Sequence, residues 1–124
     1  FTESLSPAQI KACGRATLAH SIRAFASSGC NEYTQGLLRE AVRAVLNNLK
    51  AAESGSPAAL EKLHNAAALA GAAYGNGIGL IDFKVPFHSI ATDNSLDHDR
   101  VEMLAKGVGL SGSQKLWDAC KALD

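Results

Sequence analysis

Side chains that could bind a metal or act as nucleophiles are few and widely spaced in this sequence. Its three cysteines, Cys13, Cys30 and Cys120, form no Cys-x-x-Cys pair. This spacing indicates neither a zinc knuckle nor a redox pair. Cys30 also has no neighbouring base in the sequence that would activate its thiol. We therefore expect the cysteines to act as small apolar side chains in a reducing compartment.

Asp97, His98 and Asp99 are consecutive residues that could attract a divalent metal. Acidic residues are equally suited to the first turn of a helix, because negative charge interacts favourably with the N-terminal end of the helix dipole. We favour the helix start at this position. The glycine-rich stretch from Gly75 to Gly79 follows no strand, so it lacks the context of a phosphate-binding loop.

Bulk composition excludes several classes of partner. The chain has 124 residues, of which 47% are hydrophobic, enough for one domain with a real core. Lys and Arg number 12, as do Asp and Glu, so no basic face for nucleic acid is expected. No run approaches the ~20 apolar residues of a transmembrane segment. The start at Phe1, without Met, suggests a processed or trimmed product. The compartment is unknown, and a reducing organelle, a mitochondrion or plastid, reached after removal of a targeting peptide, is one hypothesis.

The hydrophobic pattern is helical throughout. Apolar residues recur every three or four positions, and no segment alternates as a strand would, so we predict an all-α, compact bundle of about five helices. Ser6-Pro7 and Ser56-Pro57 are typical helix starts. The expected helices run from Pro7 to about Ser27, about Asn31 to Ala52, Pro57 to about Tyr74, about Asp97 to Gly107, and about Ser113 to Leu123.

Other expectations concern individual segments. The small side chains from Ala66 to Gly75 predict that the third helix is central and buried. Gly107 is expected to be the C-cap of the fourth helix. The stretch from Leu80 to Phe87 is expected to be a short helix or an extended connector, limited by Pro86. The stretch from Ile90 to Asp99 is polar and predicted to be a loop. Trp117 could either close the core or anchor a partner protein.

Two blocks of the sequence resemble the helical domain of the iron-containing (group III) alcohol dehydrogenases. The first comprises residues 1–7 (FTESLSP) and 14–25 (GRATLAHSIRAF), similar to the family's Thr-x-x-Leu/Met-Pro-Pro and Gly-x-Asp-Ala-x-x-His-Ala-x-Glu-Ala-Tyr. The second is 69–81 (LAGAAYGNGIGLI), similar to Ala-Gly-x-Ala-Phe-x-Asn-x-x-x-Gly-x-x-His. The resemblance implies a single helical domain over 1–124, of the dehydroquinate synthase/iron-alcohol-dehydrogenase type, family-like over 1–91 and divergent over 92–124.

The resemblance also implies a degenerate metal site. In the family one Asp and three His bind iron or zinc. The Asp position holds Ala16, while the first His is kept as His20, four residues later on the same helical face. The second His position holds Asp82, and the third is His88 in VPFHSIA, similar to Val-Pro-His-Gly-x-Ala, with a family insertion missing between them. Arg23 replaces a family Glu, and its positive charge disfavours a bound cation.

These departures predict no catalytic, cofactor-binding or metal-binding residues, with His20 a buried, hydrogen-bonded remnant. No counterpart of the family's dinucleotide-binding domain lies in this sequence. We expect a pseudoenzyme that is a structural or accessory subunit of a larger complex, with other protein subunits as partners. The alternative is the metal-binding helical part of an active NAD(P)-dependent dehydrogenase, with iron or zinc on His20, Asp82 and His88. A third possibility is a metal-binding module without catalysis.

Overall fold

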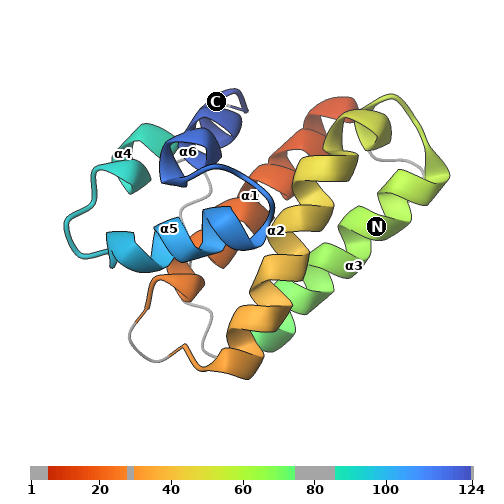
Figure 1. Ribbon diagram of the computed structural model, residues 1–124. Coiled ribbons are helices and arrows are strands. Elements are labelled where there is room, and N and C mark those ends of the chain that lie inside the picture. The colour runs from red at the N-terminus through yellow and green to blue at the C-terminus, as the bar shows by residue number, and fades with distance from the viewer. Residues whose placement is uncertain (1–5, 28–29, 75–85, 124) are drawn as a thin grey trace.

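The computed structural model describes residues 6–27, 30–74 and 86–123, and all regular structure in these residues is helical (Figure 1). The all-α prediction is confirmed. The helices are α1 (Pro7–Phe25), α2 (Glu32–Glu53), α3 (Pro57–Tyr74), α4 (Phe87–Ala91), α5 (His98–Gly107) and α6 (Ser113–Lys121). The long helix α2 packs against both α1 and α3, while α4 and α5 pack against α6 on the other side of the bundle (Figure 1). Among the helices of residues 6–27, 30–74 and 86–123, none combines the length and the hydrophobicity of a membrane span.

The predicted helix starts are confirmed in their hydrogen bonds. Ser6 and Gln9 form a reciprocal capping box, in which the Gln9 backbone N–H donates to Ser6 Oγ at 3.2 Å and the Ser6 N–H donates to Gln9 Oε1 at 2.8 Å. Pro7 occupies the first turn of α1, where its missing N–H costs nothing. The start of α2 is capped by Asn31, whose Oδ1 accepts from the Thr34 N–H at 2.8 Å.

The prediction that Gly107 is the C-cap of α5 is wrong, because Gly107 is the last helical residue and Val108 is the cap. Gly109, with φ of 90°, takes the left-handed position that ends the helix. The N–H of Leu110 then donates to the carbonyl of Ala105 at 2.9 Å, which completes a Schellman motif. Gly107 serves packing instead, since a Cβ there would lie 2.6 Å from Arg39 Cδ on α2.

Helix α4 begins at Phe87, where a short helix or a connector was expected, and extends to Ala91, inside the segment predicted to be a loop. Its buried residues are Phe87 and Ile90, three positions apart on one face, with exposed fractions of 0% and 1%. Pro86 takes the N-cap position, where a proline does not interrupt a helix. The guanidinium of Arg15 on α1 lies 4.8 Å from the centre of the Phe87 ring, a cation–π contact that fixes α4 on the bundle. Tertiary burial, which the local sequence does not reveal, stabilises this helix.

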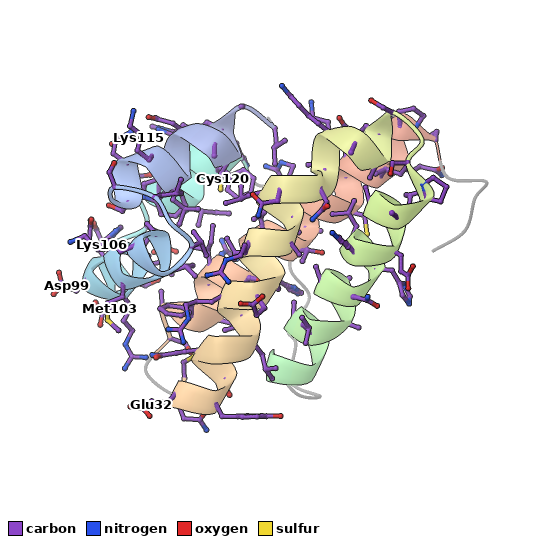
Figure 2. The ribbon with its side chains drawn as sticks, turned by 45° about the vertical axis from the view of Figure 1, so that its right-hand side comes forward. Glu32, Asp99, Met103, Lys106, Lys115 and Cys120 are labelled. Atoms are coloured by element: carbon purple, nitrogen blue, oxygen red, sulfur yellow. The ribbon has the colours of Figure 1, made fainter. Side chains whose placement is uncertain are left out.

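The prediction that α3 is central is also wrong. Helix α3 lies at the edge of the bundle (Figure 1), with Ala66 and Ala70 buried and Ala68 exposed. Among residues 66–71, whose side chains the structure describes, the small residues Ala66 and Ala70 therefore permit close approach on one face of α3. Trp117 on α6 is 6% exposed, so it closes the core, and Cys120 is fully buried on the same helix (Figure 2). All six described helices contribute to the largest fully buried side chains, which are Leu18, Ile22, Phe25, Leu38, Val42, Val45, Leu63, Phe87, Ile90, Val101, Leu104 and Leu116.

Candidate functional site

A small pocket lies where the resemblance expects the metal ligands of α1. Its volume is about 160 Å³, and its walls come from α1 and α3. The lining residues are Cys13, Ala16, Thr17, His20, Ala67, Ala70 and Gly71. Those on α1 are three or four positions apart, so the helical repeat places them on one face. The pocket therefore contains His20, which keeps the first histidine of the family's metal site, and Ala16, which stands in place of the family's metal-binding Asp.

His20 is half-buried in this pocket, and its Nε2 atom is shielded from solvent. Burial lowers the pKa of His20 below its ordinary value, and the positive charge of Arg23 lowers it further. The imidazole is consequently neutral at physiological pH, which is the form that can bind a metal. The same Arg23 charge repels a cation. The charge therefore disfavours metal binding by the His20 imidazole, although the neutral ring could act as a ligand.

The other groups in the pocket are weak candidates for metal binding. Ala16 presents a methyl group one helical turn before His20, where the family has a carboxylate. Burial raises the pKa of the Cys13 thiol, so the thiolate that a metal requires is disfavoured. The hydroxyl of Thr17 donates to the Cys13 carbonyl at 3.0 Å. Cys13 was not predicted near His20, although its spacing of seven residues, two helical turns, could have placed it there.

The structure does not bring His88 into this pocket. His88 is exposed on α4, which packs against α6 on the opposite side of the molecule from α3 (Figure 1). Asp82 lies outside the described residues. Within the described part of the chain no group of three His, Cys, Asp or Glu residues is placed to hold a metal. The described surroundings of His20 therefore do not fit a divalent cation, and no reaction step through a metal follows from them.

The acidic cluster at residues 97–99 starts a helix, as favoured from the sequence. Asp97 Oδ1 accepts from the backbone N–H groups of Asp99 at 3.1 Å and Arg100 at 3.3 Å. Asp97 Oδ2 also lies 3.5 Å from Arg100 Nε. His98 Nε2 is 3.1 Å from the carbonyl of Asp93. These bonds commit the cluster to the start of α5 rather than to a metal.

Comparisons with known proteins bear on the family. No family model matches the chain. The chain is similar to aldehyde-alcohol dehydrogenase 2 of Entamoeba histolytica, with 39% identity over 100 residues, 81% of this chain but 11% of that protein. Its fold is similar to that of an iron-containing alcohol dehydrogenase from Thermococcus thioreducens, with a TM-score of 0.76 and 17% identity, covering 98% of this chain and 37% of that one. The sequence match and the fold match agree: this chain is a helical domain of the iron-containing alcohol dehydrogenase family.

Proposed function

We propose that this chain is a non-catalytic helical domain that serves as a structural or accessory part of a larger protein assembly. The observation that supports the proposal is the methyl group of Ala16 in the His20 pocket, at the position that the resemblance assigns to a metal-binding Asp. A catalytic zinc needs about three protein ligands. The described pocket offers one neutral imidazole, a protonated thiol and a positive charge close by.

The partners proposed are other protein subunits. Among the residues that the structure describes, two large apolar side chains are exposed, Tyr33 at 77% and Met103 at 52%. The outer side of α3 also presents small residues, including Ala68, to solvent. Exposed apolar side chains on a folded domain are compatible with contact to another protein, although single ones are common on surfaces. The family relationship therefore accounts for the fold of the domain, and we propose that this fold serves in the assembly of a protein complex.

The proposal also concerns compartment. The described cysteines Cys13, Cys30 and Cys120 are free thiols. Free thiols are compatible with a reducing environment, and we propose a mitochondrion or plastid as the setting. Burial raises the pKa values of Cys13 and Cys30, which keeps both thiols protonated and unreactive.

A second candidate function is the metal-binding part of an active dehydrogenase. It is favoured by the retention of His20 in a pocket that keeps its imidazole neutral. The names of the two similar proteins describe alcohol dehydrogenases, of which the chain covers 11% and 37%. This candidate requires further ligands, Asp82 and His88, to reach His20, and a dinucleotide-binding domain to be present in the same assembly.

The experiment that separates the two candidates starts from a tagged chain isolated with its partners from its own cells. The preparation is assayed for alcohol-dependent reduction of NAD or NADP, and the copurifying proteins are identified by mass spectrometry. The proposal predicts defined partner proteins in fixed ratio to the chain. It also predicts that the dehydrogenase activity of the preparation, whatever its level, is the same with His20→Ala as with the natural sequence. Dehydrogenase activity that copurifies with the chain and disappears in His20→Ala would overturn it. An exposed lysine variant, Lys115→Ala, controls for the handling of the preparation.

A further inference from the structure

A second pocket, larger than the one at His20, lies between α1, α2 and α6. Its volume is about 280 Å³. It shares no lining residue with the His20 pocket. The residues that line it are Lys11, Leu18, Val45, Leu46, Leu49, Lys50, Glu53, Ala119, Ala122 and Leu123. The pocket is thus independent of the degenerate metal site and of the function proposed above.

The walls of this pocket are apolar and firmly held. Leu18, Val45 and Leu49 have exposed fractions of 0%, 1% and 5%, so they belong to the core of the bundle. A Cβ at Gly14 would lie 2.8 Å from Leu49 Cδ1, which shows how closely α1 and α2 approach beside the pocket. Walls built from packed helices keep their shape without a ligand. A preformed apolar pocket of this kind favours the tail of an amphipathic small molecule.

The polar lining residues are two lysines and one glutamate. Lys11 comes from α1, whereas Lys50 and Glu53 come from the last turn of α2. Neither lysine forms an ion pair with any described residue. The pocket therefore has an excess of positive charge, although the whole chain has equal numbers of acidic and basic residues. Ligands that combine an apolar tail with one negative charge match this arrangement.

We propose that the pocket between α1, α2 and α6 binds a free medium-chain aliphatic carboxylate. The tail packs against Leu46 and Leu123, which are partly exposed, and the carboxylate is held by Lys11 and Lys50. A volume of about 280 Å³ has room for about nine groups the size of a water molecule, at ~30 Å³ each. Because a methylene group has a similar size, a chain of about eight carbons fits, and octanoate is the probe of choice.

The test is titration of the purified chain with octanoate, followed by isothermal calorimetry and by amide chemical shifts. The proposal predicts saturation at one octanoate per chain, with shift changes concentrated at Leu46, Leu49, Ala119 and Leu123. Octanol, which has the same tail without the charge, should bind more weakly. Butyrate, which has the charge with a shorter tail, should also bind more weakly.

Substitutions locate the site. The double variant Lys11→Ala/Lys50→Ala should weaken octanoate binding by about tenfold, because two charge-assisted contacts at partly exposed positions are lost together. Lys115→Ala removes a lysine that projects from α6 outside the pocket (Figure 2), so it should leave the affinity unchanged. Ala119→Phe should abolish binding by filling the pocket, with an unchanged far-UV circular dichroism spectrum showing that the fold is kept.

Several results would overturn the proposal. One is a titration without saturation, or shift changes spread over the whole chain. Another is equal affinity for octanol and octanoate, which would remove the role of the lysines. Protection of the same residues by a copurifying protein, together with a failure of octanoate to bind, would identify the pocket as a protein contact instead.

Discussion

Replacing Ala16 by Asp restores the carboxylate that the resemblance expects one helical turn before His20. The pocket of about 160 Å³ has room for about five water-sized groups at ~30 Å³ each, so one carboxylate fits without overpacking. The new negative charge would face His20 and lie near Arg23. An opposite charge within about 4–6 Å raises the pKa of a histidine by about 1–3 units.

Solvent screening places the expected effect at the low end, because His20 is only half-buried. We expect the Ala16→Asp variant to raise the pKa of His20 by about one unit, equivalent to about 1.4 kcal/mol in favour of the protonated ring. The assay is an NMR titration of the His20 ring protons in both proteins. Ala16→Asn has nearly the same shape without the charge and is the matched control.

A specific result would refute this reasoning. If the pKa of His20 rose no more in Ala16→Asp than in Ala16→Asn, Ala16 and His20 would not share a pocket. The account also predicts that Ala16→Asp alone does not create tight zinc binding, because His20 and the new Asp supply two ligands where about three are needed. Tight zinc binding by this variant would show that further ligands, such as Asp82, reach the pocket.

Further predictions concern stability. Phe87→Ala should lower the free energy of unfolding by about 3–5 kcal/mol, since the ring is fully buried, as measured by urea denaturation. The pKa of His20 in the folded chain lies below its ordinary 6.5, so the unfolded chain binds more protons at this residue as the pH falls. The free energy of unfolding should therefore decrease as the pH drops below about 6.5, and His20→Gln should remove this dependence. The pKa of Glu102 is lowered by hydrogen bonds from the side chain and backbone of Ser113, so Glu102→Gln should reduce the loss of stability on acidification through about pH 4.5. Gly109→Ala should destabilise the chain by about 1 kcal/mol in thermal unfolding, because φ at this residue is 90°.

The parts of the fold that local interactions determine could be predicted from the sequence. The capping pairs of Ser6 with Gln9 and of Asn31 with Thr34 involve residues three positions apart, and their helices begin where predicted. The start of α5 at Asp97 is local for the same reason. A reader of the sequence can therefore find these helix starts without knowing what the helices pack against.

The parts of the fold that depend on contacts between distant residues could not be predicted from the sequence. Helix α4 is held by burial of Phe87 against residues far away in the chain, including Arg15, so the local sequence left its start open between helix and connector and predicted a loop at its end. Helix α5 ends at Gly107, as predicted, but its cap is Val108, and the missing Cβ of Gly107 lets Arg39 of α2 pass close to α5. Long-range packing decided both positions.

The candidate site shows the same division. The resemblance predicted the pairing of Ala16 with His20, and the helical repeat explains it. The approach of α3, which forms the other wall of the pocket, and the separation of His88 on α4 depend on how the helices pack. The pocket with Lys11 and Lys50 was not predicted, because its walls come from three helices separated in the sequence.

The most direct test of the central claim is the metal content of the chain isolated from its own cells, measured by elemental analysis. The account predicts iron and zinc far below one atom per chain, and no difference between the natural sequence and His20→Ala. One iron or zinc per chain, lost in His20→Ala, would contradict it and establish the chain as the metal-binding part of a dehydrogenase.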